Sequence, residues 1–76
     1  MDMYRIKEVV SHIVIEGKTY VTYGIHIQND EGCATATDIS TNRRAVATLR
    51  RRMHKGRLSP LHLQDVVEDW LNEGLL

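Results

Sequence analysis

The segment Thr19–Gln28 constrains the fold more than any other part of the chain, because its side chains alternate along the backbone. Its even-numbered positions are mostly polar or small, and its odd-numbered positions carry Val21, Tyr23, Ile25 and Ile27. An apolar period of two residues is typical of a β-strand with one face in a core. The segment therefore predicts a half-buried strand, which needs neighbouring strands and a covering layer to be stable.

Turn signals on either side of this strand indicate where its neighbours lie. Residues 16–18 (Glu-Gly-Lys) precede it and residues 29–32 (Asn-Asp-Glu-Gly) follow it, and both runs favour turns. The segment Tyr4–Ile15 is then the hairpin partner, and Cys33–Ile39 is a third, weaker strand. Residues 1–39 thus predict a three-stranded antiparallel β-meander.

The pairing register of the first two strands decides which side chains share a face. With a two-residue loop at residues 17–18, Val14 lies opposite Val21 and Val10 lies opposite Ile25. A slip of one residue exchanges the faces of the first strand, yet apolar residues remain on both faces of the sheet in either register. Two helices cover only one face. We therefore expect another protein chain to cover the outer face, at Val9, Ile13, Ile15 and Tyr20.

The apolar period becomes helical after residue 41. A first helix carries a narrow apolar stripe and ends at Gly56, with Lys55 in its last turn. Three neighbouring side chains compete to cap its N-terminus, namely Ser40, Thr41 and Asn42. The stripe consists of Ala45, Val46, Leu49 and Met53.

A second helix has a strong start signal. Ser59 is placed as its N-cap, Pro60 is its first helical residue, and Gly74 ends it. Its apolar stripe is Leu63, Val66, Val67 and Trp70. Only residues 56–58 join the helices, so we predict an antiparallel helix hairpin over residues 41–74. The whole chain is then one α+β domain, with the helix hairpin packed on one face of the meander.

The size and composition of the chain favour a soluble domain that needs a partner. Of its 76 residues, 42% are hydrophobic and 26% are charged, which is ordinary for a folded globule. A domain this short buries only about 60–65% of its unfolded surface, and a partner chain is one usual supplement. The single thiol, Cys33, fits a reducing cytoplasm and is more simply a small core residue than a nucleophile. The sequence has no bilayer-spanning apolar run and no signal-peptide pattern.

No arrangement of residues points to catalysis. The sequence has no glycine-rich phosphate loop, no serine nucleophile elbow and no zinc-ligand spacing. A chain of this length also leaves little room for a cavity of a few hundred cubic ångströms. We predict that the protein is not an enzyme and uses no cofactor, metal or small-molecule substrate.

Positive charge gathers on the first predicted helix. Seven of the ten basic residues lie between Arg43 and Arg57, and no acid lies between Ile39 and Gln64. At helical spacing, most of the basic residues lie opposite the apolar stripe. The candidate nucleic-acid contacts are Arg43, Arg44, Arg50, Arg51 and Lys55. The alternative is a solvated face that pairs with the acids of the second helix, and the formal net charge of zero favours it.

Three segments carry a resemblance to a known family. The runs Tyr20–Ile25, Asp38–Ser40 and Leu61–Leu71 resemble a small family of uncharacterised Gram-positive bacterial proteins, and the likeness covers nearly the whole chain. The family has no assigned activity, so the resemblance implies a bacterial cytosolic protein and transfers no catalytic residues.

These observations lead to three hypotheses about function. The first is a non-catalytic protein-interaction or regulatory module that forms a homo-oligomer through the outer sheet face or binds another protein there. The second is a nucleic-acid-associated regulator that uses the basic helix. The third and weakest is an inhibitor encoded by a phage or another mobile element.

Overall fold

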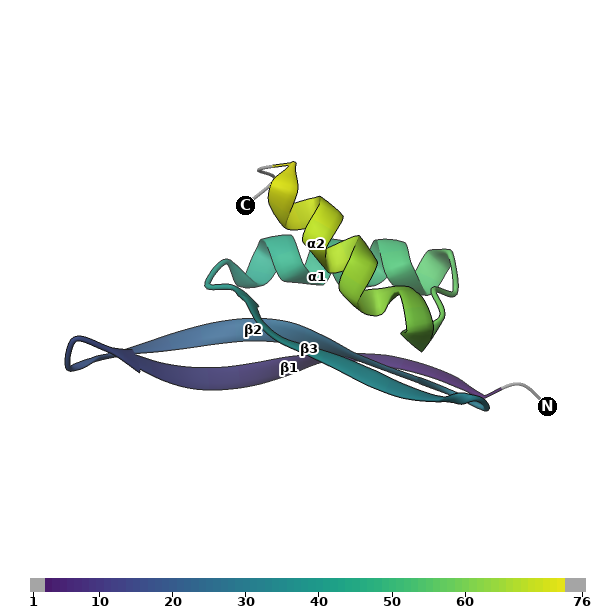
Figure 1. Cartoon of the computed structure of the whole chain (residues 1–76), viewed down its shortest axis with the longest axis horizontal. Coiled ribbons are helices and arrows are strands. Elements are labelled where there is room, and N and C mark those ends of the chain that lie inside the picture. The colour runs from purple at the N-terminus through teal and green to yellow at the C-terminus, as the bar shows by residue number, and fades with distance from the viewer. Residues whose placement is uncertain (1–2, 74–76) are drawn as a thin grey trace.

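The computed structural model describes residues 3–73 and shows a three-stranded sheet with two helices on one face (Figure 1). The strands are antiparallel and lie in the order β1-β2-β3. The predicted α+β class is confirmed. The predicted end of the second helix at Gly74, like residues 1–2, lies outside the described residues. The elements are β1 (Tyr4–Ile15), β2 (Lys18–Asn29), β3 (Gly32–Ser40), α1 (Arg43–Lys55), the 3-10 turn η1 (Pro60–His62) and α2 (Leu63–Asn72).

The turn between β1 and β2 sets a register that differs by two residues from the predicted one. Glu16 and Gly17 form the two-residue loop, with φ angles of 51° and 78°. A type I′ turn requires positive φ at both loop positions and favours glycine at the second, which these residues supply. Val14 therefore lies opposite Thr19 rather than Val21. Because the shift is an even number of residues, the predicted division of side chains between the two faces still holds.

The core lies between the sheet and the helices, as predicted. Ile25 and Ile27 of β2 are completely buried there, as is Val46 of α1. The buried cluster also contains Ala36, Ile39, Leu49, Met53, Leu63, Val67 and Trp70, with Tyr23 and Val66 packed at its margin. Cys33 is exposed on β3, so its predicted core position is wrong.

A close approach between β2 and β3 explains the glycine in the middle of β2. The pairing shifts register between Tyr23 and Ile25, which leaves Gly24 against the β3 backbone. A Cβ atom built on Gly24 would overlap the carbonyl oxygen of Ala36 and lie 2.9 Å from the Cα atom of Thr37. Glycine is the residue that allows such an approach, and the irregular pairing here is typical of a β-bulge.

The helix ends are held by local side chains. The Asn42 side chain caps α1, because its Oδ1 accepts a hydrogen bond from the Ala45 N–H at 3.1 Å. Ser59 Oγ accepts from the Leu61 N–H at 3.3 Å, with Pro60 at the first helical position as predicted. The turn that follows is 3-10, so α2 itself begins only at Leu63.

Tyr4 ties the start of β1 to the connection after α1. Its hydroxyl donates a hydrogen bond to the Leu58 carbonyl oxygen at 2.9 Å, and its ring lies 5.1 Å from the Arg57 guanidinium carbon. Partial burial raises the pKa of the Tyr4 phenol, and the nearby Arg57 charge opposes that rise. Residues more than 50 positions apart in the sequence are thereby joined.

Candidate functional site

The far end of the β1–β2 hairpin projects beyond the helix layer (Figure 1). The cause is geometric, because a strand rises about 3.3 Å per residue and a helix only 1.5 Å. The 12-residue strands therefore span about 40 Å. The 13 residues of α1 span about 20 Å. We call the part of the hairpin formed by residues 9–22 the hairpin end.

On the side of the sheet that carries the helices, the hairpin end exposes valines. Val10 is 56% exposed and Val14 is 69% exposed, and Val21 on β2 is also exposed. These residues share a face with the buried Ile25 and Ile27, so the alternation pattern assigned them to the core side. The helices end before reaching them. A comparison of the lengths of the predicted helices and strands would have identified these valines as surface residues, because the helices are too short to cover the whole sheet.

The outer side of the hairpin end carries the four residues predicted as a protein-interaction surface. Ile13 and Tyr20 are direct cross-strand partners, and Ile15 follows on the same face. Ile15 is 53% exposed and Tyr20 is 40% exposed, whereas Val9 and Ile13 are half-buried. Neither helix lies on this side of the sheet (Figure 1). The structure thus brings the four side chains onto one face and leaves two of them open to a partner.

The predicted nucleic-acid contacts on α1 lie in two different environments. Arg43, Arg44, Arg51 and Lys55 are exposed. Arg50 is half-buried, and its Nε atom lies 4.0 Å from Glu8 Oε2 on β1, so it faces the sheet instead. Within residues 3–73 this is the single ion pair of side chains, and the expected pairing of the α1 cations with the acids of α2 is not present.

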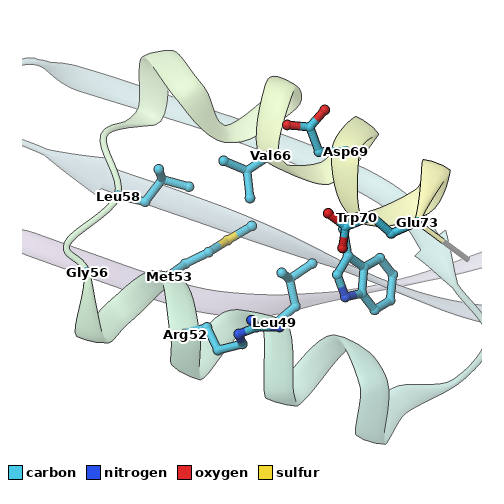
Figure 2. Close-up of a pocket in the computed structure, with 9 residues that line it drawn as sticks. All are labelled: Leu49, Arg52, Met53, Gly56, Leu58, Val66, Asp69, Trp70 and Glu73. Carbon is cyan, nitrogen blue, oxygen red and sulfur yellow. The ribbon is translucent and has the colours of Figure 1, made fainter. Parts of the chain in front are cut away.

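A groove of about 310 Å³ separates α1 from α2 (Figure 2). Its apolar lining includes Leu49, Met53 and Trp70, and Figure 2 shows their side chains pointing into the space between the helices. Arg52 of α1 contributes a positive charge, and the acids of α2 contribute negative ones at Asp69 and Glu73. The expectation of little room for a cavity of a few hundred cubic ångströms is therefore wrong, because α1 and α2 make few direct contacts with each other and leave this open groove between them.

The lining of the groove is mainly apolar, with a few charged side chains. No histidine, cysteine, serine or threonine lines it, and its ionisable side chains are those of Arg52, Asp69 and Glu73. In the described part of the chain, no three histidine, cysteine, aspartate or glutamate side chains come close enough to hold a metal ion. Across residues 3–73, no helix is both long and apolar enough to cross a membrane.

The fold and surfaces define a small α+β domain with an overhanging β-hairpin, an exposed basic helix and an open groove between helices. The chain belongs to a family of unknown function, DUF6514, whose model matches residues 3–73. The resemblance to an uncharacterised family is thereby confirmed. No curated protein and no solved structure matches the chain.

Proposed function

We propose that the protein is a non-catalytic protein-interaction module whose contact surface is the hairpin end. The observation that supports this proposal is that large apolar side chains are exposed on both faces of one projecting element. Burying a side chain such as valine, isoleucine or phenylalanine is worth roughly 1.5–3 kcal/mol when it is fully removed from water. The exposed members of the surface are Val10, Val14, Ile15, Tyr20 and Val21.

Their clustering distinguishes these residues from ordinary surface apolar groups. Single exposed apolar residues are common, but contiguous apolar patches are typical of interaction sites. Val14 and Ile15 follow one another in β1, and Tyr20 and Val21 follow one another in β2 across the same turn. Together with the half-buried Val9 and Ile13 they give the hairpin end a surface that a second protein chain can cover on either face.

Site-specific photo-crosslinking tests this function directly. A photoreactive phenylalanine analogue is placed at Tyr20 on the outer face, at Val14 on the other face, or at the exposed Asp65 of α2 as the matched control. We expect irradiation in living cells to give defined covalent protein adducts from positions 20 or 14 and none from position 65. A hairpin end that gives no adduct at either position, in a protein that is folded and expressed, would contradict the proposal.

A second candidate function rests on the basic helix. Four of the five predicted nucleic-acid contacts on α1 are exposed and have no acidic partner within ion-pair distance in the described structure, so they are available to a phosphate backbone. The formal net charge of zero weakens the long-range attraction of a polyanion. We therefore rank nucleic-acid association below protein interaction. The four residues are Arg43, Arg44, Arg51 and Lys55.

We also propose that the protein acts in the cytoplasm of a Gram-positive bacterium. The resemblance of its motifs to proteins from such bacteria supports the origin. The free and exposed thiol of Cys33 supports a reducing compartment, because oxidising compartments favour disulfides. Labelling of Cys33 by a membrane-impermeant maleimide only after cell lysis is the expected result, and labelling of intact cells would contradict this location.

A further inference from the structure

The two edges of the sheet differ in how they are protected against pairing with another strand. β3 has 9 residues against the 12 of β1, its pairing with β2 is irregular, and Asp38 within it has a φ of 54°. η1 and α2 also pack against β3. Bulges, short length, charge and covering elements are the usual devices that prevent edge-to-edge association. The β3 edge therefore has several of these devices.

The β1 edge lacks these devices over residues 9–15. This stretch reads Val-Val-Ser-His-Ile-Val-Ile and contains no lysine, arginine, aspartate, glutamate, proline or glycine. The pairing of β1 with β2 is regular throughout, and β2 is the only strand beside β1 in the described sheet. The charged residues of β1, Arg5, Lys7 and Glu8, all lie at its other end. An exposed, apolar edge strand of this kind is a template for strand pairing.

The hairpin turn determines which backbone groups of this edge are free. In an antiparallel pair, residues alternate between those bonded to the neighbour and those whose N–H and C=O point away. A two-residue turn closes with a hydrogen-bonded pair, here Ile15 with Lys18. By alternation, the outward-directed N–H and C=O groups belong to Val10, His12 and Val14.

We infer that β1 pairs antiparallel with β1 of a second copy of this chain, with His12 on the two-fold axis. This inference rests on the proposed function and names its partner and its contact. The two sheets then form one six-stranded sheet with the order β3-β2-β1-β1-β2-β3. A two-fold interface uses the same surface of both copies, so the edge must be complementary to itself.

This register makes the edge self-complementary. Val10 of one copy lies opposite Val14 of the other on the side of the helices. On the outer side, Val9 lies opposite Ile15, and Ser11 lies opposite Ile13. Directly opposed apolar side chains stabilise strand pairing. A register shifted by two residues in one direction places Glu8 opposite Val14, and a shift in the other direction shortens the paired segment.

The size of the interface predicts a weak dimer. Seven paired residues extend over roughly 24 Å at 3.4 Å per residue. A single strand pair of this length is smaller than the interfaces of about 800 Å² per partner that support stable complexes. We therefore expect a dimer whose dissociation constant is in the micromolar range, so that the fraction of chains in the dimer depends on the protein concentration.

Sedimentation velocity across a wide range of protein concentrations tests the pairing. His12→Lys places two cations directly opposite each other on the axis, and like charges in that position oppose pairing. Gln64→Lys is the matched control, because Gln64 is exposed on α2, outside the hairpin end, and the substitution adds the same charge. We expect His12→Lys to raise the dissociation constant roughly tenfold or more, and Gln64→Lys to leave it nearly unchanged.

Amide hydrogen exchange supplies a second readout that identifies the surface. The amides of Val10, His12 and Val14 should become protected as the concentration rises, in the wild type but not in His12→Lys. A wild-type dimer that both lysine variants leave intact, without this protection, overturns the inference. A wild-type protein that stays monomeric at the highest concentration also overturns it. In that case, crosslinks from positions 14 or 20 to a different protein would still support the proposed function.

Discussion

Replacing Trp70 by alanine should destabilise this domain more than any other single truncation. Trp70 is 7% exposed and belongs to the buried cluster between α2, α1 and the sheet. Truncation of a buried tryptophan to alanine costs about 3–5 kcal/mol, as lost burial plus the cavity that remains. A domain of this length has a total stability of roughly 4–11 kcal/mol. Trp70→Ala should therefore remove a large part of the free energy of unfolding.

Urea denaturation followed by far-ultraviolet circular dichroism measures this loss, since the variant has no tryptophan for fluorescence. A loss of 3 kcal/mol should also lower the thermal midpoint by about 12 °C or more. Leu61→Ala is the control, because Leu61 is 80% exposed and should change the stability by less than about 0.5 kcal/mol. A loss below about 1 kcal/mol for Trp70→Ala would refute the packing described for α2.

Three further results are expected. Gly24→Ala should cost about 1–3 kcal/mol or more in the same urea assay, because its Cβ meets the backbone of Ala36, which cannot rotate away. Tyr4→Phe should cost about 1 kcal/mol through the lost bond to Leu58. Burial raises the pKa of Tyr4 in the folded protein. The resulting contribution to the free energy of unfolding is complete below about pH 10, the pKa of tyrosine in an unfolded chain, and is lost as the pH rises through the folded pKa. Tyr4→Phe lacks this group, so it should lose less stability at alkaline pH than the wild type. Duplex DNA should bind weakly and not at physiological salt, whereas a log–log salt slope of about −4 that Arg51→Ala reduces by about one would favour the nucleic-acid function.

The secondary structure was predictable because the sequence changes its apolar period once and clearly. Alternation in β2 and the helical stripes of α1 and α2 correspond to the observed elements, and Ser59 and Pro60 mark the second helical segment as expected. The register of the hairpin was not predictable from alternation alone. Loops at residues 16–17 and 17–18 leave the same side chains on each face, and only the backbone angles of Glu16 and Gly17 distinguish them.

The direction of the outer-face side chains in the proposed contact surface was predictable, whereas the exposure of the valines on the helix side was missed. Alternation states the direction of a side chain but does not state whether anything covers it. Val10, Val14 and Val21 point to the same side as the core and are nevertheless exposed. The partner of Arg50 was missed for a related reason, since helical spacing gives the angular position of a residue but not the reach of Glu8 from a neighbouring strand.

The length of the hairpin is the strongest reason to place function there. The molecule is 47 Å long, whereas a helix of 13 residues covers only about 20 Å of sheet. The β2 members of the buried cluster, Ile25 and Ile27, lie in the half of β2 farther from the turn, and no residue of the hairpin end belongs to that cluster. The hairpin end adds little to that core and exposes apolar side chains that favour aggregation. A partner that covers the hairpin end removes this liability, and an edge that is complementary to itself makes a second copy of the chain a suitable partner.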